Sequence, residues 1–175
     1  SQALTINHPT KVRSLCSVMS NTGDRRNGGI SLKLIRAIGL PKPPSTKQAA
    51  VDDSLRLWRH ISGDHFDADE TRQRAEAGLE RSWCPDGVMR QVAAIGGSDD
   101  RTAGLRNVKA PSLVIHGLKD LLVAPSGGTA TAAAIPGSRL LMFPDMGHNL
   151  PEPRQDEMVA AIVRNTLRSS AGDGA

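Results

Sequence analysis

Short apolar runs and amphipathic stretches alternate along the chain in the order typical of a mixed α/β protein. Three apolar runs have the length of strands: Val12–Val18, Leu113–Ile115 and Leu140–Phe143. The Ala-rich stretch Thr129–Ile135 between the last two favours a helix, and a crossover of this length predicts that the strands are parallel. Glu152–Leu167 has the pattern of a final amphipathic helix. We therefore predict an α/β fold built on about three parallel strands.

A long region without strand patterns separates the first apolar run from the second. It extends from about Gly23 to Arg106, which is too long for a plain connection between two strands. Four helical patterns fill it, at 30–38, 50–61, 67–83 and 84–97. We predict a partial core formed by residues 1–20 and 104–175, and a helical cap or lid formed by residues 21–103.

Composition excludes several classes of function. The net charge of +4 is spread along the chain, and only two Trp, two Phe and no Tyr could stack on nucleic-acid bases, so we predict no nucleic-acid partner. No apolar run approaches the ~20 residues of a membrane span. Cys16 and Cys84 have no metal-site or disulfide spacing. With no signal peptide at the start, these features predict a cytoplasmic protein with reduced cysteines.

An acid and a histidine follow the second and third apolar runs. Asp120 comes after Leu113–Ile115, and His148 comes after Leu140–Phe143. The carboxyl ends of parallel strands meet at one edge of the sheet, so we expect the two side chains to lie side by side. A histidine oriented by a carboxylate is how general bases are built. Taken singly, each residue could equally be an ordinary turn residue.

The surrounding motifs resemble the C-terminal end of the α/β-hydrolases. They are PSLVIHGLKDLLVAPSGG and AIPGSRLLMFPDMGHNLP, and they are most similar to the esterase branch that includes aclacinomycin methylesterase and the cofactor-free haloperoxidase-like proteins. NHPTKVRSL resembles the segment leading into the family's sixth strand, and PDGVMRQVAAIGGSDDRTAGL resembles the exit from its cap.

The resemblance implies an ester hydrolase that needs no cofactor and acts on a small-molecule ester. In this reading Asp120 is the catalytic acid, which orients the base, and His148 is the catalytic base. We assign Met19, Leu122 and Met146 to the substrate-binding site.

The family's nucleophile motif does not occur in the sequence. α/β-Hydrolases carry their serine in a Gly-x-Ser-x-Gly turn, and the 175 residues contain no such turn. By comparison with the family, SQALTINHP is the far end of the helix that follows this turn, which places the serine upstream of Ser1. We therefore predict a C-terminal part of a hydrolase that is inactive alone. The strand at Val12–Val18 would then have an unpaired edge, which predicts self-association.

Residues inside the chain are weaker candidates for the missing role. Ser17, Ser20 and Ser126 have the character of turn serines, and Asp24 is a second candidate for the acid because some relatives carry it after that strand. A metal site could be composed of His116, Asp120, Asp145 and His148. However, residues i and i+4 of a strand and turn do not share a face, so we predict no metal.

Two further questions stay open at this stage. Trp58, Trp83, Met89 and Val92 could line an acyl pocket, although packing between cap helices explains them more simply. The function could also be ligand binding without catalysis, or dehalogenase or epoxide-hydrolase chemistry with an aspartate nucleophile.

Overall fold

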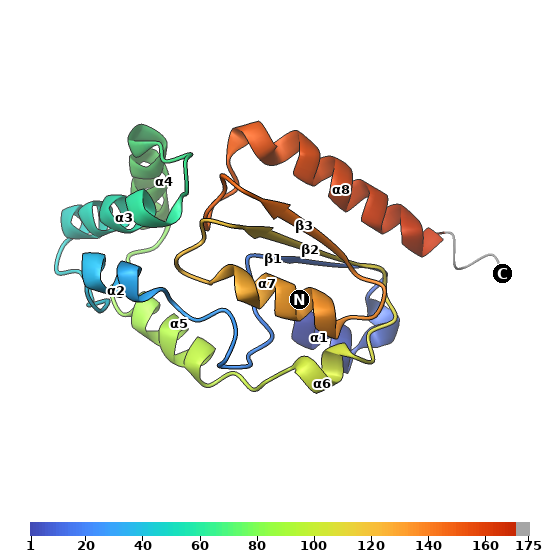
Figure 1. Ribbon diagram of the computed structural model, residues 1–175. Helices are drawn as coiled ribbons and strands as arrows, with labels where there is room; N and C mark the ends of the chain where they lie inside the picture. Colours follow the sequence, from blue (N-terminus) through green and yellow to red (C-terminus); the bar gives the residue numbers. More distant parts are fainter. Residues whose placement is uncertain (171–175) are drawn as a thin grey trace.

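The computed structural model describes residues 1–170 and holds a three-stranded parallel sheet in the order β1-β2-β3. The strands are β1 (Leu15–Val18), β2 (Ser112–Gly117) and β3 (Arg139–Phe143). Cys16 pairs with Leu113, and Ile115 pairs with Leu141. The predicted parallel sheet is confirmed, and the carboxyl ends of its strands lie at one edge (Figure 1).

Helices cover both faces of this sheet. α8 (Glu152–Ser170) lies on one face, while α7 (Pro125–Ala134) lies on the other, near α1 (Gln2–Asn7) and α6 (Thr102–Leu105) (Figure 1). A short 3-10 turn, Pro9–Lys11, leads from α1 toward β1. The helix predicted over 129–135 starts four residues earlier than predicted, at Pro125, because the fixed φ of proline suits the first position of a helix.

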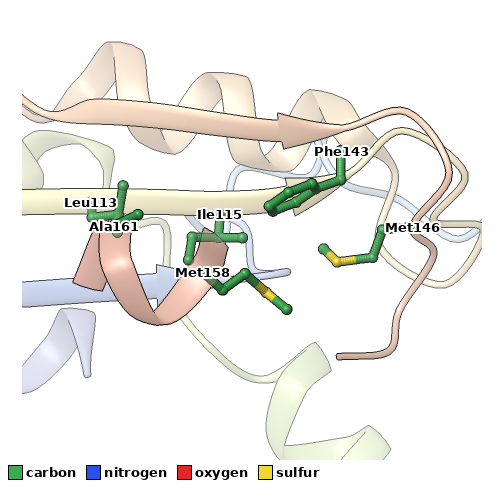
Figure 2. Close-up of a cluster of buried hydrophobic side chains, with 6 residues drawn as sticks. All are labelled: Leu113, Ile115, Phe143, Met146, Met158 and Ala161. Carbon is green, nitrogen blue, oxygen red and sulfur yellow. The ribbon is translucent and has the colours of Figure 1, made fainter. Parts of the chain in front are cut away.

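Alternating side chains of β2 divide the core between these faces. Leu113 and Ile115 pack with Phe143 against Met158 and Ala161 of α8 (Figure 2). His116 faces α7, because a Cβ built at Gly128 of α7 would come within 2.6 Å of its ring. Successive side chains of a strand point to opposite faces of the sheet, so β2 contributes to the core on both faces.

A buried amide ties α8 to the starts of two strands. Asn165 is 2% exposed, and its Nδ2 donates hydrogen bonds to the carbonyl oxygens of Leu15 (3.1 Å) and Pro111 (3.2 Å). Leu15 is the first residue of β1 and Pro111 directly precedes β2, so the side chain of Asn165 adds a buried donor where these two strands begin.

Residues 21–103, which we predicted to form a helical insertion, hold helices and no strand. The helices are α2 (Leu32–Ile38), α3 (Lys47–Ile61), α4 (Ala68–Arg81) and α5 (Gly87–Gly96). Ser31, Thr46 and Asp67 cap the first three of these by accepting backbone N–H groups. α3 and α4 lie beyond the carboxyl ends of the strands (Figure 1).

α5 differs from the packing predicted for it. Its residues Met89 and Val92 are 39% and 47% exposed, and Trp83 before it is 39% exposed. The prediction that these side chains hold the helices together is therefore wrong, since they lie on the surface of the described structure. Within the same described part, no helix combines the length and apolar character that a membrane crossing requires.

Candidate active site

The turn after β2 buries one carboxylate and leaves a single oxygen of it free for a partner. The side chain of Asp120 has no exposed surface. Its Oδ1 accepts the backbone N–H groups of Leu122 (2.9 Å) and Val123 (2.8 Å). Both bonds arise from a local Asx-type turn, so the sequence itself fixes the orientation of this carboxylate.

His148 meets the other oxygen of Asp120. Its Nδ1 lies 2.8 Å from Oδ2 of Asp120, and its side chain is 24% exposed. The predicted contact between the two residues is confirmed. Because a carboxylate only accepts hydrogen bonds, Nδ1 donates in this contact, and Nε2 is the ring nitrogen left to face another partner. This is the arrangement of a general base and its orienting acid.

Two glycines allow the loop of His148 to lie against its neighbours. A Cβ built at Gly147 would lie 2.0 Å from the carbonyl oxygen of Ile61, and one at Gly117 would lie 2.2 Å from that of Met146. The backbone N–H of His148 also donates to the Ile61 carbonyl (2.5 Å). The loop of His148 therefore lies between the end of β2 and the end of α3, with no room for a side chain at Gly117 or Gly147.

A second histidine supports the turn of Asp120. His116 is fully buried, and its Nε2 lies 2.9 Å from the carbonyl oxygen of Val123 and 3.5 Å from Oδ2 of Asp120. Its Nδ1 is buried without a hydrogen-bond partner in the described structure. The described residues contain no cluster of three or more potential metal ligands.

A cavity of about 680 Å³ opens beside His148. Its wall is formed by the end of β1, by α3 and α4, and by the loop after His148. Six of the residues that line it are Met19, Trp58, His65, Phe66, Arg74 and His148. Two of the chain's four aromatic side chains therefore face one space, next to the candidate base.

Comparisons with known proteins agree with this architecture. No protein-family model matches the chain. Rhodomycin D methylesterase DnrP of Streptomyces peucetius is 30% identical over 131 residues, which cover 73% of this chain and 43% of that protein. Rhodomycin D methylesterase DauP of Streptomyces sp. (strain C5) is 27% identical over 129 residues, with the same shares. The chain thus spans less than half the length of these relatives.

Solved structures match over nearly the whole chain. A meta-cleavage product hydrolase from Pseudomonas fluorescens IP01 has a TM-score of 0.65 at 16% identity, over 96% of this chain and 60% of its own. Est816, an enzyme that degrades N-acyl homoserine lactones, has a TM-score of 0.59 at 22% identity, over 91% of this chain and 61% of its own. The chain belongs to the α/β-hydrolase superfamily.

The residues assigned to substrate binding in this α/β-hydrolase lie in different places. Met19 lines the cavity from the end of β1, and its φ of 45° is an unusual conformation for a residue other than glycine. Leu122 is half-buried and is absent from the cavity wall. Met146 is fully buried in the core beneath α8 (Figure 2), so its side chain does not reach the cavity.

The alternative nucleophiles and the second acid all have other partners. Ser17 accepts a hydrogen bond from Gln2, and Ser126 accepts one from the backbone of Gly28. Ser20 has only a long contact, 3.5 Å, to the next carbonyl. Asp24 is bound by Arg26, which lowers its pKa to about 2. Among the described residues, none of these four is bonded to His148.

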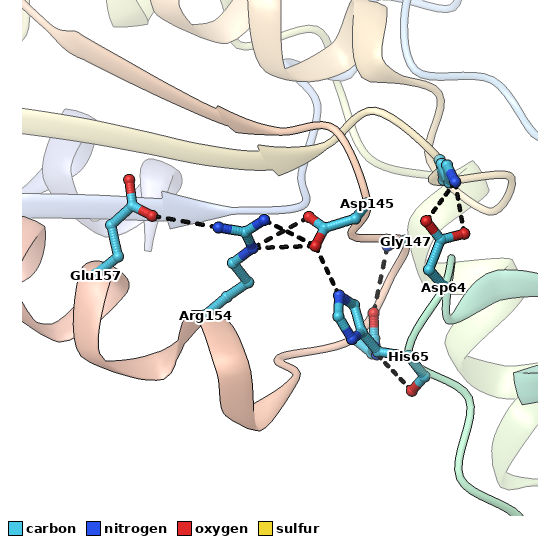
Figure 3. A network of polar contacts seen from close by, with 8 residues as sticks. Asp64, His65, Asp145, Gly147, Arg154 and Glu157 are labelled. Carbon is cyan, nitrogen blue, oxygen red and sulfur yellow. Dashed lines mark hydrogen bonds and ion pairs between the residues drawn. The ribbon is translucent and has the colours of Figure 1, made fainter.

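A polar network next to the pair Asp120 and His148, called the dyad from here on, was not predicted. Asp145 accepts hydrogen bonds from Arg154 (2.8 and 3.1 Å) and lies 2.8 Å from Nε2 of His65 (Figure 3). The Arg154 guanidinium, followed by His65, holds the pKa of Asp145 well below its usual range. His65 follows α3 in a segment without a recognisable motif, so only the folded chain reveals its position.

Proposed function

We propose that residues 1–175 supply the base and orienting acid of a carboxylic-ester hydrolase. The observation that carries the proposal is the 2.8 Å contact between His148 and a fully buried Asp120, at the wall of a cavity. His148 Nε2 takes the proton of a nucleophilic hydroxyl as it attacks the ester carbonyl, and then gives it to the leaving alcohol. Asp120 holds the ring tautomer and stabilises the imidazolium.

The proposal places the nucleophilic serine upstream of Ser1. The 175 residues contain no Gly-x-Ser-x-Gly, and no serine is bonded to His148 in the part of the chain that the structure describes. Without this upstream serine, the base and its orienting acid have no nucleophile to activate. The chain by itself is therefore expected to hydrolyse esters no faster than background.

The substrate is a small-molecule ester bound in the cavity, with residues 21–103 acting as a cap. Apolar and aromatic side chains are typical of the walls of such sites. Trp58, Phe66 and Met19 provide part of such a wall here, and charged side chains of α4 also line the cavity. The two curated relatives are methylesterases by name. This favours a serine nucleophile over the aspartate of dehalogenases and epoxide hydrolases.

A chimera tests the proposal. Residues 1–175 replace the matching part of rhodomycin D methylesterase DnrP, and hydrolysis of p-nitrophenyl esters and of a methyl ester is measured. We expect turnover, and we expect His148→Ala and Asp120→Asn each to reduce kcat by about 10³-fold or more, as losses of a base or its orienting acid do.

His60→Ala is the matched control, because His60 lies in α3 and is not among the residues that line the cavity. It should leave kcat unchanged. A chimera that unfolds cooperatively but shows no turnover would contradict the esterase proposal, as would full activity in His148→Ala. A folded, inactive chimera that still binds esters would point to ligand binding without catalysis.

A further inference from the structure

One short segment of the helical insertion contacts both loops that carry the dyad. It runs from Ile61 to His65 at the end of α3. The backbone N–H of His148 donates to the carbonyl of Ile61 (2.5 Å), and Nδ2 of Asn149 donates to that of His65 (3.3 Å). Gly63 forms an isolated antiparallel bridge with Met146. The segment thus binds the residues on both sides of His148 as well as His148 itself.

Two consecutive side chains of this segment extend the contact. Asp64 accepts hydrogen bonds from Nζ of Lys119, the neighbour of Asp120, at 2.5 Å. His65 Nε2 lies 2.8 Å from Oδ2 of Asp145, three residues before His148 (Figure 3). Asp64 therefore contacts the loop of the acid, and His65 contacts the loop of the base.

Burial separates these two contacts. The side chains of Asp64 and Lys119 are 55% and 47% exposed, and ion pairs this exposed to water contribute little to stability. The side chains of His65 and Asp145 are each 22% exposed. The pair of His65 and Asp145 is the less exposed of the two, so it is the one able to restrict the loop of His148.

Asp145 is itself fixed to the core of the protein. Arg154 of α8 binds both of its carboxylate oxygens, and the Arg154 guanidinium lies over the ring of Phe143, 5.4 Å from its centroid. This bidentate geometry allows little rotation of the carboxylate. His65 is therefore held against a rigid partner, and through it the end of α3 is held against the turn that presents His148.

We infer that His65 is a positioning residue for the base, an inference that rests on the function proposed above. By donating from Nε2 to Asp145, His65 keeps the turn 145–149 against the end of α3. The ring of His148 then stays within 2.8 Å of Asp120 while its other nitrogen remains available to the cavity. His65 lines the same cavity, so the insertion that encloses the substrate also aligns the base.

Nitrogen-15 NMR of histidine rings tests this inference on the full 175-residue chain. The signal to follow is the Nδ1 proton of His148, which hydrogen bonding to Asp120 protects from exchange with water. Two variants of His65 differ by one methylene. His65→Gln keeps an N–H donor near the position of Nε2 and should keep the signal, whereas the shorter His65→Asn cannot reach Asp145 and should lose it. His60→Asn is the matched control and should keep it.

Each outcome has a distinct meaning. If the unaltered chain shows no protonated Nδ1 on His148, the dyad itself, and with it the proposed function, is wrong. If the unaltered chain shows the signal and His65→Asn retains it at the same shift and intensity, only the positioning role is overturned. Equal loss in His65→Gln, or loss in His60→Asn, also overturns it, because the effect then does not depend on the donor to Asp145.

Discussion

Replacing Gly147 with alanine tests whether the loop of His148 is packed as closely as the structure indicates. A Cβ there would lie 2.0 Å from the carbonyl oxygen and 2.8 Å from the carbonyl carbon of Ile61, and 2.6 Å from the amide nitrogen of Gly63. All three atoms belong to the backbone, so no flexible side chain can turn aside. The two segments must separate by about 1 Å before the oxygen reaches the 3.0 Å that real Cβ contacts keep.

The size of the effect follows from this separation. Overpacking of a tight contact costs about 1–3 kcal/mol. The bond from the His148 N–H to the Ile61 carbonyl is lost as well, which costs about 1 kcal/mol. We therefore expect Gly147→Ala to lower the free energy of unfolding by about 2–4 kcal/mol. For a chain of 175 residues, this lowers the Tm by roughly 5–15 °C.

Thermal unfolding followed by circular dichroism measures the difference. Gly78→Ala is the control, because a Cβ at Gly78 meets nothing within 4 Å and the residue lies inside α4. That change should stabilise the protein by roughly 0.5–1 kcal/mol, since alanine is the better helix former. If Gly147→Ala melts with the unaltered protein while Gly78→Ala shifts as expected, the close approach of α3 to the loop of His148 is refuted.

Three further predictions concern stability and association. The depressed pKa of Asp145 means that its contribution to stability is present above its unfolded pKa of about 4 and is lost as the pH falls further; urea titrations at low pH should show a smaller decline for Asp145→Asn. Asn165→Leu removes the side-chain donor to the carbonyls of Leu15 and Pro111, although the latter keeps the backbone N–H of Leu15, and should cost about 1–3 kcal/mol in urea, whereas the exposed Val163→Ala should stay within about 0.5 kcal/mol. β1 pairs only with β2 in the described sheet, so sedimentation velocity should show association that grows with concentration; a monomer at every concentration would contradict this.

The sheet could be predicted from the sequence because its strands are apolar on both faces. Leu113–Ile115 is a continuous apolar run, which is typical of a strand covered by helices on either side. Leu140–Phe143 is also continuously apolar, although only Phe143 of it is buried. The helices of the insertion were predictable from their periodicity, since capping residues mark where three of them begin. How these helices pack was not predictable, because an apolar stripe such as that of α5 indicates a buried face whether or not a neighbour covers it.

The contact of the dyad could be predicted for a topological reason, and its surroundings could not. Parallel strands with neighbouring carboxyl ends bring Asp120 and His148 together whatever the details of their loops. Met146 lies only two residues from His148, yet its side chain is buried in the core with Phe143 and does not line the cavity. His65 comes from a segment 80 residues away from its partner Asp145, and no local pattern reports such a distant contact.

The two members of the dyad have opposite exposures, and their proposed roles require this difference. A buried charge is costly unless hydrogen bonds replace the water it loses, and Asp120 has three: two backbone N–H groups and the ring of His148. With those bonds in place, the carboxylate can accept the imidazole in only one direction. His148 must instead reach the cavity to exchange a proton, and a quarter of its side chain is exposed. The buried acid cannot turn, and the base is open on one side only. The imidazole therefore has one tautomer and one direction from which a substrate can approach it. The chain forms the acid and the base from the loops at the ends of two neighbouring strands.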